Sequence, residues 1–186
     1  GLGSEVYRDL DSVPDFAKLA FAGLMGPAAK SASRLRDLVA GMFGVRVEVE
    51  EFVGMRLMFE PEERSVMGRQ NANLGQNMLL GAGVFSVQDK IRLRLFTPTL
   101  GRYREFLPTG RLARLLSDLV FFYAGAEIAW DVELGLPAGE AAPVRLGESG
   151  QLGWTTWMAP NWSNAETTIR TDARFDLASR FGQGPA

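Results

Sequence analysis

The chain contains the stretch Lys90-Ile91-Arg92-Leu93-Arg94-Leu95-Phe96, in which charged and apolar side chains alternate strictly. Alternate residues of an extended chain point to opposite sides, so this two-residue period indicates a half-buried β-strand. Two other stretches, about 45–52 and about 127–136, show the same period with mainly acidic polar positions. Opposite charges on neighbouring strands stabilise a sheet by roughly 0.2–1 kcal/mol per pair, whereas like charges destabilise it. We therefore predict that 90–96 is the central strand, between the two acidic ones.

Helical patterns surround these strands. Apolar residues recur at helical spacing, bounded by Ser, Pro or Gly at their ends, in four segments: about 14–26, 31–44, 98–107 and 110–125. Together the patterns predict an α+β fold, in which a small, mainly antiparallel sheet packs on amphipathic helices and long loops protrude.

The expected organisation has three parts. Residues 1–30 form a lead-in and a first helix, residues 31–170 form one α+β domain, and residues 171–186 form a polar tail that needs a partner to become ordered. The domain divides into two similar helix-strand-loop units, 31–97 and 98–170, because Leu38 matches Leu119 and Gly44 matches Gly125 at one constant spacing. Two amphipathic helices also match easily without common structure, so the pattern is compatible with a true repeat and with shared patterning alike.

The composition excludes several classes of function. The chain has no Cys and no His, which removes disulfides, thiolate nucleophiles, His-based catalytic triads and the usual nitrogen and sulfur metal ligands. No phosphate-binding loop is present, so we predict no cofactor and no metal. The net charge of −2 argues against bulk binding to nucleic acid or to an anionic membrane. No apolar run approaches the length needed to cross a bilayer, and we expect a cytoplasmic protein without direct membrane insertion.

Carboxylates leave one catalytic alternative open. Glu127, Asp131 and Glu133 could supply a carboxylate pair for a hydrolase, which requires one carboxyl group with a raised pKa. We favour instead a solvated strand face that pairs with Arg92 and Arg94, because carboxylates already paired with cations make poor general acids. We therefore expect no enzymatic activity.

A second alternative is a module that binds single-stranded nucleic acid. Arg92 and Arg94, together with Lys90, could form a basic track beside the aromatic residues Phe96 and Tyr103. The acidic strands expected on both sides would cancel that positive field, which makes this alternative the weaker one.

Two long excursions follow the helix-strand units, at about 55–83 and 137–162. Neither has the apolar period to build its own core, yet both contain large apolar residues, and exposed residues of this kind mark interfaces. We therefore predict that the excursions bind partners through these residues: Met55, Leu57, Met58, Phe59, Trp154, Trp157 and Trp162. The competing interpretation is that the loops fold back over the apolar face of the sheet.

Several segments, taken in order, resemble the TssG (ImpH/VasB) family of the type VI secretion baseplate. They include the steps Leu74-Gly75 and Leu80-Gly81 and the segments 49–54, 88–95, 103–110, 125–131, 145–147 and 152–157. The resemblance covers about residues 1–157, the C-terminal portion of such a protein. Two places depart from the family pattern: Phe85-Ser86 stands where a Trp-Asp pair is usual, and Met55-Arg56 where a Trp is common.

The resemblance implies a structural role. A member of this family is expected to be a scaffold subunit of the baseplate wedge, which holds two copies of TssF and docks TssK trimers around the VgrG spike hub. It implies a cytoplasmic location within a membrane-docked assembly, no catalytic activity and no cofactor.

Overall fold

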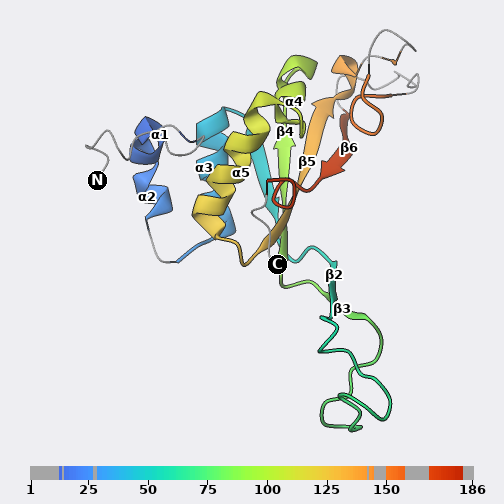
Figure 1. The fold of residues 1–186 in the computed structure, drawn as a ribbon. Helices are drawn as coiled ribbons and strands as arrows, with labels where there is room; N and C mark the ends of the chain where they lie inside the picture. Colours follow the sequence, from blue (N-terminus) through green and yellow to red (C-terminus); the bar gives the residue numbers. More distant parts are fainter. Residues whose placement is uncertain are drawn as a thin grey trace.

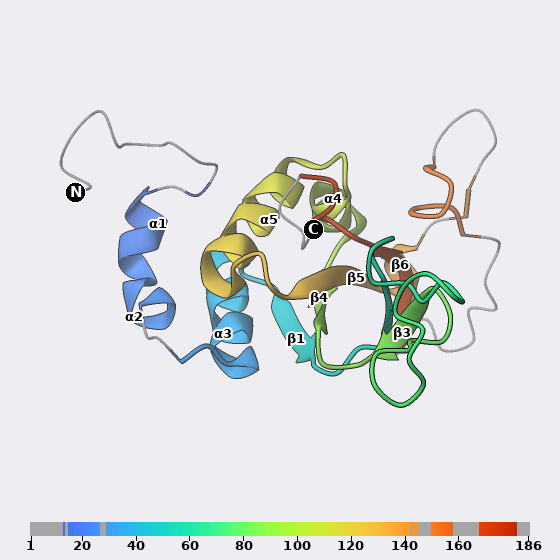
Figure 2. The same ribbon diagram turned by 60° about the horizontal axis from the view of Figure 1, so that its bottom comes forward.

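The computed structural model describes residues 13, 15–26, 29–141, 143–144, 150–157 and 168–181. Its helices are α1 (Asp15–Ala20), α2 (Ala22–Met25), α3 (Ala32–Phe43), α4 (Leu100–Phe106), α5 (Arg111–Ala124) and the 3-10 helix η2 (Ala138–Glu140). Its strands are β1 (Arg46–Glu50), β2 (Met55–Met58), β3 (Gly83–Ser86), β4 (Lys90–Phe96), β5 (Ala129–Pro137) and β6 (Ile169–Phe175). Helices and sheet form one body, and the β2–β3 pair projects away from it (Figures 1 and 2). The predicted α+β class is confirmed.

The main sheet has four strands in the order β1-β4-β5-β6, so β4 is central as predicted. β4 runs antiparallel to β1 and parallel to β5, and β5 runs antiparallel to β6. In this register Leu93 lies opposite Val49 on one side and Val132 on the other. Two of the three pairings are antiparallel, which fits the mainly antiparallel sheet expected from the sequence.

The apolar face of the sheet forms the core with the helices. Leu93 and Leu95 of β4 are completely buried, and Trp130 of β5 is nearly so. Across from them, Phe43 of α3 and Phe106 of α4 make an edge-to-face contact with ring centroids 5.3 Å apart. The two-residue period of the strands and the helical stripes therefore meet in one hydrophobic layer.

The helices that precede β1 and β5 each end at a glycine with a positive φ. Gly44 has φ +63° and donates its N–H to the carbonyl of Ala40, while Gly125 has φ +78° and donates to that of Phe121. Glycine adopts a positive φ without steric cost, which is why each helix stops there and the chain turns into a strand. Packing differs between the two units, because α3 lies against β1 whereas α4 is the main helical neighbour of β5.

The sequence predicts a polar tail over residues 171–186, and this prediction is wrong for residues 171–181, which the structure describes. Residues 169–175 form β6, the edge strand beside β5, and Ala173, Leu177 and Ala178 are buried in the core. Its sequence gives little sign of a strand beyond a possible short one at about 167–170, because its inward positions include a small Ala among polar neighbours, which leaves almost no apolar period. Residues 182–186 of the predicted tail lie outside the described residues.

Candidate protein-interaction site

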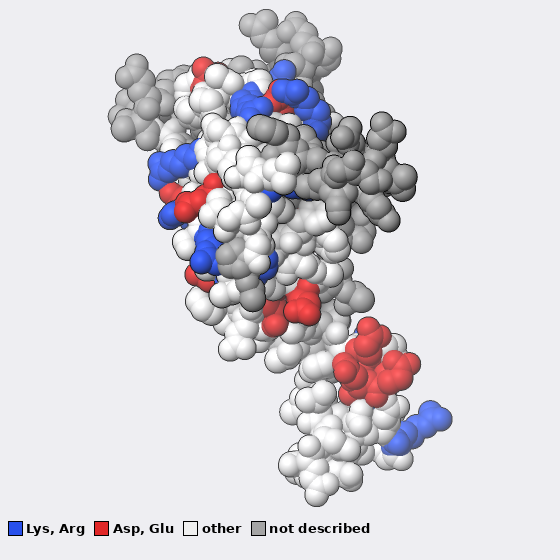
Figure 3. Space-filling view, turned by 90° about the vertical axis from the view of Figure 1, so that its left-hand side faces the viewer, with Lys and Arg blue, Asp and Glu red and all other residues white. Residues whose placement is uncertain are grey.

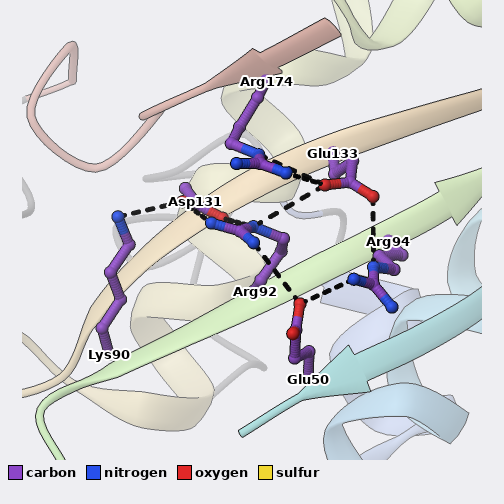
Figure 4. A network of polar contacts seen from close by, with 7 residues as sticks. All are labelled: Glu50, Lys90, Arg92, Arg94, Asp131, Glu133 and Arg174. Carbon is purple, nitrogen blue, oxygen red and sulfur yellow. Dashed lines mark hydrogen bonds and ion pairs between the residues drawn. The ribbon is translucent and has the colours of Figure 1, made fainter. Parts of the chain in front are cut away.

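A network of ion pairs covers the polar face of the sheet (Figure 4). Arg92 donates two hydrogen bonds to Asp131, from Nε to Oδ1 at 2.6 Å and from Nη2 to Oδ2 at 2.9 Å. Lys90 contacts the same carboxylate at 2.9 Å. Glu50 on β1 bridges Arg92 at 3.4 Å and Arg94 at 2.9 Å. The predicted pairing of the basic strand with both acidic strands is confirmed.

Glu133 ties β5 to both of its neighbours in the same network. Its Oε1 accepts a hydrogen bond from Arg94 of β4 at 3.1 Å, and its Oε2 accepts one from Arg174 of β6 at 2.5 Å. The side chains of Asp131 and Glu133 are only 6% and 4% exposed. The expectation of a solvated strand face is therefore wrong, because long arginine side chains lie over these carboxylates.

The electrostatics of this network do not suit acid–base catalysis. Burial opposes the charged form of Asp131, but hydrogen bonds from Arg92 and Lys90 outweigh it and lower the pKa of this carboxyl below its ordinary value. A general acid needs the opposite shift. Glu127 lies apart and exposed, in a groove of about 280 Å³ between α3 and α5. The arginines proposed for nucleic acid are likewise engaged, Arg92 with Asp131 and Arg94 with Glu50 and Glu133.

The β2–β3 arm comprises residues 54–88 and is largely exposed to solvent. It pairs Met55 with Ser86 and Met58 with Gly83, and no residue between 54 and 88 is buried. Of the predicted binding residues here, Met58 is 59% exposed, while Met55, Leu57 and Phe59 are half-buried. An isolated two-stranded ribbon has no core of its own, so its apolar side chains are available to a partner.

Hydrogen bonds, and not apolar packing, stabilise the end of the arm. Asn71 donates from Nδ2 to the carbonyls of Glu62 at 3.2 Å and Glu63 at 3.0 Å, and the amide of Leu79 donates to Oγ of Ser65 at 2.8 Å. No charged residue occurs between Arg69 and Asp89. Figure 3 shows the consequence: acidic residues gather on the part of the arm nearer the body, and most of the remaining arm is uncharged surface.

The second excursion behaves differently in the part that is described. Trp157 is buried, with its ring 5.9 Å from that of Tyr103 and its Nε1 donating to Asp172 at 3.0 Å. The hydroxyl of Tyr103 donates to the carbonyl of Trp154 at 3.0 Å, and burial of that hydroxyl raises the pKa of Tyr103. Contrary to the expectation of exposed tryptophans, Trp157 anchors the loop to the core and Trp154 is half-buried. Trp162 lies outside the described residues.

The most exposed apolar side chains are not among the binding residues predicted from the sequence. Among the large hydrophobic residues described, the highest exposures are 92% for Leu152, 91% for Met67 and 85% for Leu74. A signal was present, because each of them is followed directly by Gly in a segment without helical or strand period. Both excursions therefore carry exposed apolar side chains, but not only the predicted ones.

The described helices include none that is long and apolar enough to span a membrane. Within the same residues, no group of acidic side chains is arranged to hold a metal ion. The fold combines an ion-paired sheet with two excursions that expose apolar residues. Exposed apolar residues of this kind are typical of surfaces that bind other proteins.

The comparisons specify the family. The family profile described as "Type VI secretion, TssG" matches residues 1–159, and the chain therefore belongs to the TssG family. No individual curated protein matches the chain. Among solved structures, a chain in the type VI secretion system TssK-TssF-TssG baseplate subcomplex is similar with TM-score 0.66 and 22% identity over 89% of this chain and 70% of that one. A chain in the baseplate complex from the type VI secretion system is similar with TM-score 0.58 and 24% identity, over 94% of this chain and 50% of that one.

Proposed function

We propose that this chain is a structural subunit of the type VI secretion baseplate wedge, which holds copies of TssF and docks TssK trimers around the VgrG hub. Membership of the TssG family carries the proposal, and the similar solved chain is part of a subcomplex that contains TssK and TssF. The subunit acts without catalysis, in the cytoplasm, within an assembly docked at the membrane. The ion pairs of the polar sheet face support this, because they engage Asp131, Glu133, Arg92 and Arg94, on which the hydrolase and nucleic-acid alternatives depend.

The β2–β3 arm is the part that we assign to TssK. It projects from the body, has no core of its own and exposes apolar residues such as Met58 and Phe85. TssF would contact the body, which the arm leaves accessible. We assign the second excursion to the TssK-binding surface as well. Its Trp157 is buried and holds the excursion against the core, so other residues of the excursion would contact TssK.

Co-purification tests the proposal. Deletion of residues 60–70 should abolish or halve TssK capture while TssF stays bound, because the deleted segment makes no contribution to the buried core. The matched control replaces Glu62 and Glu63 with Gln, which keeps the length of the arm and removes exposed charge. Loss of TssF with retention of TssK would contradict the assignment. If the intact chain captures neither protein, the proposed function is wrong.

A further inference from the structure

The entry segment, residues 51–53, connects β1 to the β2–β3 arm, and both of its ends are fixed. Glu50 of β1 lies opposite Arg92, and its carboxylate contacts the guanidinium of Arg92 at 3.4 Å. Val53 is only 7% exposed, and its amide donates to the carbonyl of Lys90 at 3.1 Å. The chain advances three residues from Glu50 to Val53 while β4 advances two, from Arg92 to Lys90. The entry segment therefore carries one residue more than a regular antiparallel ladder, as in a β-bulge.

Phe52 accommodates the extra residue with a backbone φ of +60°. In this left-handed region the Cβ atom crowds the backbone carbonyl, so glycine is favoured, asparagine is tolerated and a bulky side chain is strained. Among the residues that the structure describes, the other non-glycine residue with a positive φ is Asn71, at +48°. Because asparagine tolerates this conformation, the strain is concentrated at Phe52.

The side chain of Phe52 does not compensate for this strain. Its ring is 70% exposed, so it gains little free energy from packing. A strained residue persists only where the surrounding structure imposes its conformation. Here the constraint comes from Val53, whose burial and hydrogen bond to Lys90 would both be lost if the segment straightened. The strain at Phe52 and the burial of Val53 therefore oppose each other.

The arm is stiff directly beyond the entry segment. The ring of Phe85 lies against Gly54 and leaves no room there for a Cβ atom. Met55 pairs with Ser86, whose Oγ donates a hydrogen bond to the carboxylate of Asp89. A change in the backbone angles of Phe52 would therefore turn the arm as a unit and would not bend it along its length.

We propose that the entry segment is a two-state joint that sets the direction of the arm. In the held state, which the structure shows, Phe52 has a positive φ, Val53 is buried, and the arm projects as in Figures 1 and 2. In the released state, Phe52 is extended, Val53 is exposed, and the arm points in another direction. The equilibrium belongs to the free chain, so the inference goes beyond the proposed function and does not depend on it. A partner that binds one direction only would shift the populations.

Double electron–electron resonance on the full chain measures the direction of the arm. The chain has no cysteine, so Gln76→Cys on the arm and Arg114→Cys on α5 introduce the only thiols for spin labels, both at exposed positions. Val53→Ala weakens the burial that favours the held state, and it should add a second distance to the single main distance of the unchanged joint. A second label pair, Arg36→Cys with Arg114→Cys, lies entirely on the body and should keep one distance throughout.

Substitutions at residue 52 then test whether the strain drives the second distance. In the Val53→Ala background, Phe52→Asn should reduce the population of the second distance roughly tenfold, because asparagine tolerates the positive φ. Phe52→Val should increase it, because a β-branched residue is more strained there. Val84→Asn is the matched control, since Val84 is exposed on β3 without a positive φ, and it should change nothing.

Urea unfolding gives a second measurement that does not require Val53→Ala to fold. Phe52→Asn alone should raise the urea midpoint, because it relieves strain in the folded chain, whereas Val84→Asn should not. A lower midpoint for Phe52→Asn would overturn the inference. So would a single distance in every variant, or a second distance that Phe52→Asn leaves unchanged. Neither TssK nor TssF is present in these measurements, so a negative result leaves the proposed function standing.

Discussion

Replacing Arg92 with Met should lower the free energy of unfolding by about 3 kcal/mol, because it leaves the carboxylate of Asp131 buried with Lys90 as its remaining partner. The Arg92 and Asp131 side chains are 11% and 6% exposed, so solvent screens their interaction little. A domain is stable by roughly 5–15 kcal/mol in total, which makes such a loss easy to measure. The assay is urea unfolding followed by circular dichroism, with the midpoint and slope fitted separately.

Two further variants make the reasoning refutable. Arg111→Met removes an arginine that is 72% exposed and pairs with Glu105, and it should cost less than about 1 kcal/mol. Adding Asp131→Leu to Arg92→Met removes the stranded charge and should recover much of the loss, since apolar replacement of a buried ion pair is often close to neutral. If Arg92→Met costs no more than Arg111→Met, or if the double variant is less stable than the single one, burial of the ion pair is not the cause.

Three other predictions concern the core, the dependence of stability on pH, and the second excursion. Leu93→Asp should prevent folding, seen as lost circular dichroism, because residue 93 is fully buried, whereas Val84→Asp on the exposed arm should be tolerated. The pKa of Asp131 is lowered in the folded protein, so its ion pairs stabilise the fold fully above about pH 5 and lose their effect as the pH falls through the folded-state pKa. Urea unfolding at a series of pH values from neutral to acidic should show this decline in the free energy of unfolding. The decline with pH should be smaller in Asp131→Asn. Trp157→Phe retains the ring beside Tyr103 but removes the hydrogen bond to Asp172, and it should cost about 1 kcal/mol in the same unfolding assay.

The sequence predicted the arrangement of three strands because charge and apolar period act together there. Lys90, Arg92 and Arg94 can be satisfied on both sides only if β4 lies between acidic strands, and the register bears this out. The two-residue period distinguishes the polar face of a strand from its apolar face, but it does not predict whether other side chains cover the polar face. Glu133 is buried partly by Arg174 of β6, and β6 itself has too little apolar period to be recognised from its sequence.

The candidate site was predicted as two segments and missed in its details. A tryptophan in a Gly-rich loop has the same local sequence whether it faces solvent or the core, and only the position of Tyr103 and Asp172 decides that Trp157 is buried. Leu74 and Leu152 gave no periodic signal, because a turn is defined by hydrogen bonds over five residues and not by a stripe. What marks them is the glycine that follows each, with φ +78° at Gly75 and φ +80° at Gly153.

The buried ion network and the two excursions are connected through the strands from which the excursions extend. The arm leaves the sheet just after Glu50, where the amide of Val53 still bonds to the carbonyl of Lys90 at 3.1 Å, and the second excursion follows β5, which Asp131 and Glu133 tie to its neighbours. If both excursions bind TssK, as proposed, the sheet sets the distance between the two binding segments, and binding at one segment raises the effective concentration at the other. Weakening the ion network should therefore leave the affinity of each excursion by itself intact and weaken TssK binding to the two excursions together. Arg92→Met, assayed for TssK binding under conditions in which the variant stays folded, tests this, and deletion of residues 60–70 is the comparison because it shortens one excursion and leaves the network intact.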